Sequence, residues 1–142
     1  MILEYRTAAW WYWLATVFAL AAALVGSPLG VYPAMLLTVL HGHYFTIRGY
    51  RLASFPLQVR IAYLLLLVAG LLPPLAFIHW LQLAFTTVRV LFAYCLLART
   101  LSLMPWHRRG PLDWRRVWRT YATPPTRGSF LETAEPGFAT GK

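Results

Sequence analysis

The stretch AAWWYWLATVFALAAALV, Ala8–Val25, decides the class of this protein, because it contains 18 consecutive residues without a charged side chain. A run of this length is typical of a transmembrane helix, and the Trp and Tyr residues at its start favour the interface between membrane and water. A cleaved signal peptide is the alternative, since Ala21, Ala22 and Ala23 offer small residues near a cleavage position. The leader, residues 1–6, carries one acid and one base and lacks the basic region of a signal peptide, so we expect a retained span.

The whole chain shares this bias. Of its 142 residues, 59% are hydrophobic and 12% are charged, whereas soluble domains average about 45–50% and about 25%. Thirteen basic residues against four acidic ones would suit a nucleic-acid-binding protein, but the basic residues gather at the ends of apolar runs. This distribution argues against nucleic acid as a partner and favours a protein with several membrane spans. The single cysteine, Cys95, excludes an internal disulfide and a thiolate metal site.

Two more apolar runs follow the first. The second, residues 31–47, lies between an uncharged turn at 26–30 and a basic turn at 48–51. The third, residues 57–72, carries Arg60 in its first turn and ends at two prolines. Each run is close to the shortest length that crosses a bilayer as a helix.

The last apolar segment, residues 75–103, contains no Gly or Pro in 29 residues and is expected to form one long helix. At 1.5 Å per residue this helix would extend roughly 43 Å, whereas the hydrocarbon core of a membrane is about 30 Å thick. We expect the excess to tilt or emerge near Arg99.

The positions of the basic residues predict the topology. The turns at 26–30 and 73–74 have none, whereas the leader, the loop at 48–60 and the region from Arg99 onward contain all of them except Arg89. The positive-inside rule then places both termini in the cytoplasm. We therefore predict an all-α integral membrane protein with four transmembrane helices in residues 1–104, in a bacterial cytoplasmic (inner) membrane.

Residues 105–121 are expected to form an amphipathic segment on the cytoplasmic face. From Pro111 on, an apolar face repeats at helical spacing and is flanked by arginines; the residues are Trp114, Val117, Trp118 and Tyr121, with Arg115, Arg116 and Arg119 beside them. Such a helix lies on the inner leaflet and is attracted by anionic phospholipid, or it packs against a partner protein. Residues 122–142, rich in Pro and Gly, are expected to form an irregular tail.

Polar side chains form a stripe on the fourth apolar segment. His79, Gln82, Thr86 and Arg89 are separated by three, four and three residues, which places them on one helical face. A polar face seldom points at lipid tails, so we expect the stripe to line a site or to contact a partner subunit or lipid. In the alternative, the stripe has no binding role: His79 and Gln82 lie near the headgroups, Thr86 bonds its own backbone and Arg89 reaches the interface.

Arg89 has no acidic counterpart in the apolar segments, because all four acids of the chain lie outside them, at Glu4, Asp113, Glu132 and Glu135. A guanidinium does not lose its proton to escape burial. Its counter-charge is therefore expected from backbone carbonyls, a lipid phosphate, a ligand or another polypeptide. This mismatch is the main reason to expect a partner.

His41 and His43 raise the question of a metal or haem site. Two residues apart on a helix, the two rings point about 200° apart and cannot bind one ion together. We expect His41 to hydrogen-bond with Thr38, one turn back, and keep haem, quinone or proton binding at His41 as alternatives. The aromatic cluster Trp10, Trp11 and Trp13 is expected to anchor the helix at the interface, to stack on a pigment or to pack on a neighbour.

No phosphate-binding loop, Ser/His/Asp set or paired carboxylates occur in the sequence, so we expect no catalytic residues and no metal ligands. The predicted function is a non-catalytic accessory subunit of a larger integral membrane complex, of the electron-transfer or photosynthetic type, which docks through aromatic faces and Arg89. One alternative is a small redox protein that holds haem or quinone at His41 and Arg89. Another is a small oligomeric transporter whose anionic substrate meets Arg89.

Overall fold

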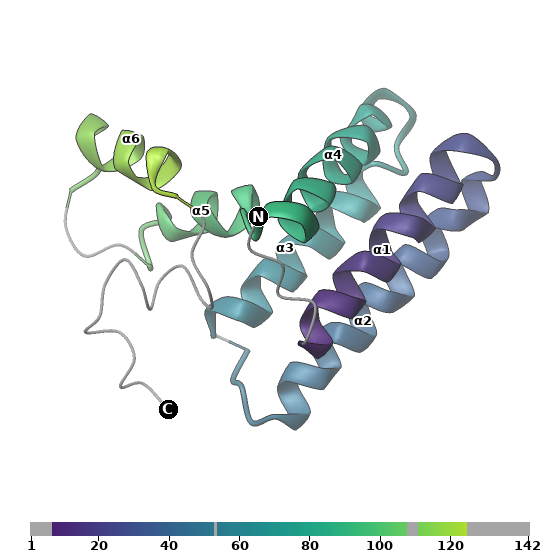
Figure 1. Cartoon of the computed structure of the whole chain (residues 1–142), viewed down its shortest axis with the longest axis horizontal. Coiled ribbons are helices and arrows are strands. Elements are labelled where there is room, and N and C mark those ends of the chain that lie inside the picture. Colours follow the sequence, from purple (N-terminus) through teal and green to yellow (C-terminus); the bar gives the residue numbers. More distant parts are fainter. Residues whose placement is uncertain (1–6, 53, 108–110, 125–142) are drawn as a thin grey trace.

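The computed structural model describes residues 7–52, 54–107 and 111–124, and the regular secondary structure of this part of the chain is all helical, without strands (Figure 1). The helices are α1 (Ala8–Val25), α2 (Val31–Ile47), α3 (Phe55–Ala69), α4 (Phe77–Phe92), α5 (Leu96–Ser102) and α6 (Trp114–Ala122). Two short 3₁₀ turns, Pro28–Gly30 and Pro73–Leu75, precede α2 and α4.

The first four helices form an antiparallel bundle. Helix α1 packs against α2 and α4, and α2 also packs against α3, whereas α3 and α4 touch each other less. The turns between α1 and α2 and between α3 and α4 lie at one end of the bundle, and the α2–α3 loop, α5 and α6 lie at the other (Figure 1). The uncharged turns and the basic loop therefore lie at opposite ends, as the distribution of basic residues predicted.

Local signals explain the first two helices. The Thr7 hydroxyl accepts a hydrogen bond from the Trp10 amide at 3.3 Å and caps α1. At the following turn, a Cβ on Gly30 would lie 2.7 Å from the backbone nitrogen of Ala23, so only glycine permits this close approach. The predicted ranges Ala8–Val25 and Val31–Ile47 are confirmed as helices, and the third run forms a helix at Phe55–Ala69, slightly earlier than predicted.

The single long helix predicted for residues 75–103 is wrong. Helix α4 ends at Phe92, and Ala93 adopts a left-handed conformation, with φ 55° and ψ 25°. The chain then changes direction, and α5 places Ala98 against Phe55 and Val59 of α3. No Gly or Pro marks the break in the sequence. The turn is accompanied by the packing of α5 on α3, and tertiary contacts of this kind can override local helix propensity.

Two helical segments are long and apolar enough to cross a membrane, Ala8–Val25 and Pro73–Phe92, and the apolar helix Phe55–Ala69 is shorter. Only 22% of each long segment is buried, whereas a core helix of a soluble protein is mostly buried. Length and composition thus give weak support for membrane association through two helices, and the predicted four spans are not confirmed.

The bundle buries several polar side chains beside its apolar core and exposes many large apolar ones. The interior cluster of Trp13, Leu20, Ala34, Tyr63, Leu67 and Val90 is accompanied by seven buried polar residues on the four helices, namely Thr16, Thr38, His41, Arg60, His79, Gln82 and Thr86. The exterior of α1–α4 exposes rings and aliphatic chains such as Phe18 (67%), Leu36 (59%), Leu65 (63%) and Trp80 (57%). In soluble proteins, Arg, Gln and Thr are mostly exposed, whereas Leu and Phe are often fully buried.

Candidate functional site

The polar stripe of α4 faces α3 rather than the exterior. His79, Gln82 and Thr86 are buried. One ring nitrogen of His79 lies 3.1 Å from the Leu67 carbonyl oxygen, and the Gln82 amide donates to the Tyr63 carbonyl at 3.1 Å. The hydroxyls of Tyr63 and Thr86 are 2.9 Å apart. Three of the four stripe residues therefore join two helices of the same chain, and Thr86 bonds Tyr63 rather than its own backbone.

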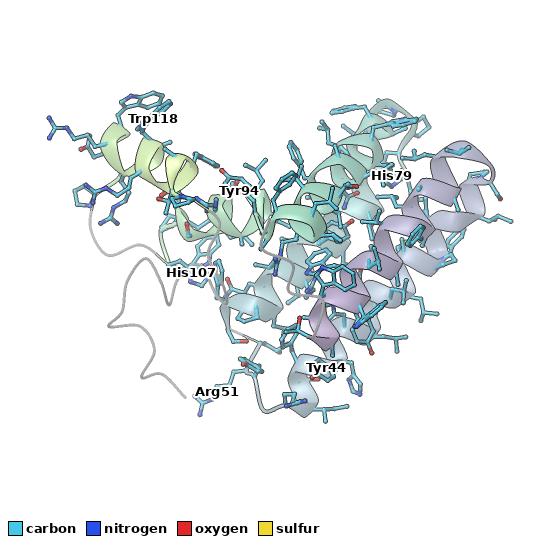
Figure 2. The ribbon with its side chains drawn as sticks, in the orientation of Figure 1. Tyr44, Arg51, His79, Tyr94, His107 and Trp118 are labelled. Atoms are coloured by element: carbon cyan, nitrogen blue, oxygen red, sulfur yellow. The ribbon has the colours of Figure 1, made fainter. Side chains whose placement is uncertain are left out.

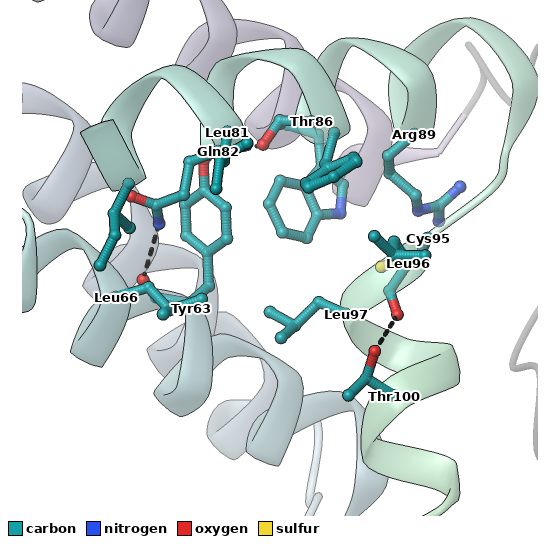
Figure 3. Close-up of a pocket in the computed structure, with 13 residues that line it drawn as sticks. Tyr63, Leu66, Leu81, Gln82, Thr86, Arg89, Cys95, Leu96, Leu97 and Thr100 are labelled. Carbon is teal, nitrogen blue, oxygen red and sulfur yellow. Dashed lines mark hydrogen bonds between the residues drawn. The ribbon is translucent and has the colours of Figure 1, made fainter. Parts of the chain in front are cut away.

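Arg89, at the end of this stripe, is half-buried and lines a cavity of about 220 Å³ between α3, α4 and α5 (Figure 3). The cavity walls are mainly apolar, and Trp13 of α1 forms part of them. In Figure 3, Arg89 and Gln82 lie at opposite ends of the cavity, with Leu97 between them. The cavity thus combines a hydrocarbon lining with a positive charge at one end.

A second arginine, Arg60 of α3, is buried more deeply than Arg89, with 6% of its surface exposed. Its guanidinium carbon lies 3.6 Å from the ring centroid of Trp13, and one terminal nitrogen lies 3.2 Å from Nε2 of His41. Its Nε is buried without a hydrogen-bond partner. Sequence reasoning gave Arg60 no role, although its spacing from the apolar residues Tyr63 and Leu67 already indicated an inward face.

His41 is enclosed by aromatic rings. Tyr12 and Phe45 stack on it at centroid distances of 4.5 and 5.1 Å. The predicted hydrogen bond between His41 and Thr38 is wrong, because the Thr38 hydroxyl donates to the Ala34 carbonyl, while Nε2 of His41 meets Arg60. With both faces covered and Nε2 beside a guanidinium, this ring does not fit the role of an axial haem ligand.

The described residues contain no group of three His, Cys, Asp or Glu side chains that could hold a metal ion. Among the described residues the only acid is Asp113, which precedes α6. The described charges at this end of the bundle are therefore mostly positive.

The aromatic cluster of α1 divides between interior and exterior. Trp13 is buried, and Trp10 is half-buried and donates its indole N–H to the Val90 carbonyl at 3.1 Å. Trp11 is 59% exposed. Of the three rings predicted to contact lipid or a partner, only Trp11 has most of its surface available.

Hydrogen bonds join the carboxyl end of α6 to α5 and to the residue Tyr94 before it. Arg99 donates to the carbonyls of Thr120 and Pro124, and the Tyr94 hydroxyl donates to the Tyr121 carbonyl at 2.8 Å. The opposite face exposes Trp114 (75%) and Trp118 (67%), the latter visible in Figure 2. The predicted apolar face is therefore divided: Val117 and Tyr121 are half-buried, the two Trp rings are exposed, Arg115 and Arg119 are exposed beside them, and Arg116 is half-buried.

Comparison with protein-family models, curated protein sequences and solved structures finds no match to this chain.

Proposed function

We propose that this chain is a four-span integral membrane protein and a non-catalytic subunit of a larger membrane complex. The observation that carries the proposal is that the bundle exposes many large apolar side chains and buries polar ones beside its apolar core. Monomeric soluble proteins rarely expose contiguous apolar patches larger than a few hundred Å², whereas here all four bundle helices expose large apolar side chains and bury polar ones.

Helices α2 and α3 follow this pattern, although they are shorter than the other two. Helix α2 exposes Leu36, Val39 and Leu40 and buries Thr38 and His41. Helix α3 exposes Leu65 and Val68 and buries Arg60. A soluble protein would gain nothing from this arrangement, whereas in a membrane it exposes hydrocarbon to lipid and lets buried polar groups pair inside the bundle. The 17 residues of α2 reach the lower limit of a spanning helix.

The basic end of the bundle is assigned to the cytoplasm of a bacterial cell and the uncharged turns to the opposite side. The basic loop with Arg48 and Arg51, together with α5 and α6, lies at one end (Figure 1). This assignment rests on the positive-inside rule.

The role in a complex is inferred from the residues that the described part of the chain exposes. The described residues include no metal-binding cluster, and the polar stripe of α4 bonds to α3 of the same chain. Docking to other subunits is therefore assigned to exposed aromatic rings, such as Trp11, Tyr32 and Trp80, rather than to the stripe. An electron-transfer or photosynthetic complex remains the class of partner expected from the sequence.

Extraction and reporter experiments test the membrane part of this proposal. The chain is expected to stay in the membrane fraction after carbonate treatment at high pH. Reporters fused after Arg51 and after Arg109 should report cytoplasm, and a reporter after Gly30 the opposite side. Release by carbonate, or a reversed reporter at Arg109, would contradict four spans with both termini inside.

The complex is tested by the mass of the protein solubilised from its own membrane in mild detergent. Co-purification of other membrane subunits at fixed stoichiometry supports the accessory role. A chain that purifies without other subunits contradicts it, and copies of the chain associated with each other favour the oligomeric transporter alternative.

A further inference from the structure

The cavity between α3, α4 and α5 has no part in the role proposed above. It is lined by apolar side chains and by three residues that form hydrogen bonds between α3 and α4, namely Tyr63, Gln82 and Thr86. We propose that it binds a ligand with one aromatic ring and a ring hydroxyl group, a member of the phenol class. The ligand is identified by the volume of the cavity, by its aromatic walls and by the hydrogen-bonding groups beside it.

The volume of the cavity fits one ring. A cavity of about 150 Å³ lined by Leu, Ile and Phe side chains binds benzene, whereas pockets for drug-sized ligands measure about 300–1,000 Å³. This cavity, at about 220 Å³, lies between the two sizes. It therefore has room for a single substituted ring but not for a whole drug-sized molecule.

Three aromatic rings contribute to the walls, from Trp13, Tyr63 and Phe85. Trp13 and Tyr63 meet edge to face, with ring centroids 5.1 Å apart, and the Arg60 guanidinium carbon lies 3.6 Å from the Trp13 centroid. These contacts hold the Trp13 ring in place. Pairs of aromatic rings contribute free energy beyond the area that they bury, so these walls favour a ring over an acyl chain as the occupant.

One donor and one acceptor at the cavity have no partner among the described residues. The hydroxyls of Tyr63 and Thr86 are 2.9 Å apart, and one hydrogen bond between them uses only one of their two protons. Figure 3 shows the Tyr63 side chain extending from α3 towards Thr86 of α4. Gln82 donates its amide to the Tyr63 carbonyl at 3.1 Å, whereas its Oε1 atom is buried without a hydrogen-bond partner.

A ring hydroxyl group can use both. Gln82 and Thr86 are four residues apart and lie on one face of α4. The ligand oxygen can accept the spare proton of the Tyr63 and Thr86 hydroxyls, and its own proton can be donated to Oε1 of Gln82. A buried acceptor without a partner costs free energy. A phenol removes this cost, whereas an acyl chain leaves both groups unpartnered and an ether uses only the donor.

The cavity opens on the outer surface of the bundle. Leu81 and Phe85 line it and are also exposed, so they mark its mouth. Under the proposed membrane insertion, on which this step rests, the mouth faces lipid. An apolar phenol can then enter from the bilayer, and a hydrocarbon substituent on its ring can remain there.

The test uses the full-length chain in mild detergent and three probes: 4-ethylphenol, ethylbenzene and 4-ethylanisole, whose ether oxygen accepts a hydrogen bond but donates none. Equilibrium dialysis measures the bound probe, and each affinity is expressed relative to the partition of that probe into empty micelles. We expect one 4-ethylphenol per chain, bound about tenfold more tightly than ethylbenzene. The affinity for 4-ethylanisole should lie between the other two.

Two variants with matched controls locate the binding. Gln82→Met should remove the preference for 4-ethylphenol while ethylbenzene still binds, whereas Gln58→Met makes the same change outside the cavity and should keep the preference. Leu97→Trp should fill the cavity and abolish the binding of all three probes, whereas Leu65→Trp, on the exposed surface of α3, should not. If circular dichroism shows that Gln82→Met does not fold, 4-ethylphenol against 4-ethylanisole on the wild type tests the donated hydrogen bond.

Three results would overturn the inference: equal affinity of the wild type for 4-ethylphenol and ethylbenzene, equal binding by Leu97→Trp and Leu65→Trp, or a preference that Gln82→Met leaves unchanged. Retention of the chain in the membrane after carbonate treatment, without selective binding of 4-ethylphenol, contradicts this inference alone. Release by carbonate contradicts the proposed function, whereas the binding measured in detergent stands or fails separately.

Discussion

The guanidinium carbon of Arg60 lies 3.6 Å from the ring centroid of Trp13, so an indole ring faces this deeply buried charge. A desolvated cation–π contact of this kind contributes about 2 kcal/mol or more. Burying an ion in a low-dielectric interior costs several kcal/mol of desolvation free energy. The contact therefore offsets the burial of Arg60 only in part.

From this relationship we expect Arg60→Met to raise the thermal unfolding midpoint of the delipidated protein, because Met keeps the length of the side chain and removes the charge. Trp13→Leu should lower the midpoint by an amount corresponding to roughly 3–5 kcal/mol, since it leaves a cavity and removes the ring that contacts the buried charge of Arg60. A double-mutant cycle in detergent should give a coupling of about 2 kcal/mol between the two positions. Additive effects would show that the ring does not stabilise the cation.

The site around Arg60 could not be assembled from sequence. Its parts come from α1, α2 and α3, and no spacing along the chain relates Trp13 to His41 or to Arg60. The bounds of α1 and α2, by contrast, were predictable, because uncharged runs, a glycine turn and a basic turn mark them locally. Sequence signals were therefore sufficient where local chemistry ends a helix and insufficient where three helices meet.

The turn before α2 depends on the absence of a side chain at Gly30. Gly30→Ala should destabilise the protein by about 1–3 kcal/mol, because its Cβ would lie 2.7 Å from a backbone atom of α1, which cannot move without separating the helices. Gly26→Ala is the control, since its Cβ would meet only an ordinary contact at 3.6 Å. Thermal unfolding of both variants in detergent measures the difference, and equal midpoints would refute the close approach of the two helices.

The break between α4 and α5 can be tested by a substitution whose effect changes sign with the conformation. Ala93 has φ 55°, a region that glycine enters without strain, so Ala93→Gly should leave stability unchanged or raise it. If residues 75–103 formed one continuous helix, the same substitution would cost about 1 kcal/mol. Ala84→Gly, in the middle of α4, is the control and should show that loss. An equal loss of stability at both positions would instead support one continuous helix over residues 75–103.

The exposed face of α6 is expected to contact anionic lipid. Trp114 and Trp118 expose their rings, and Arg115 and Arg119 lie beside them. In nanodiscs, anionic lipid should slow hydrogen exchange of the α6 amides relative to neutral lipid, and Arg115→Glu with Arg119→Glu should remove about 1 kcal/mol of binding per lost charge. Equal protection in neutral and anionic nanodiscs would point instead to contact with a partner protein.

His107, outside the bundle, should make the stability of the cytoplasmic end depend on pH. Burial lowers the pKa of His107 below its usual value of 6.5, and its ring donates a hydrogen bond to the side-chain oxygen of Gln58 at the start of α3. Below pH 6.5 the unfolded chain therefore binds a proton more readily than the folded one. Stability should be constant above this pH and fall as the pH decreases from about 6.5 towards the lowered pKa of the folded state.

Unfolding midpoints of the wild type and of His107→Gln between pH 5 and pH 8 measure the effect. The wild type should lose stability towards pH 5 relative to His107→Gln, because glutamine keeps a donor for Gln58 but does not titrate. Parallel pH profiles for the two proteins would show that His107 has the same pKa in the folded and unfolded states.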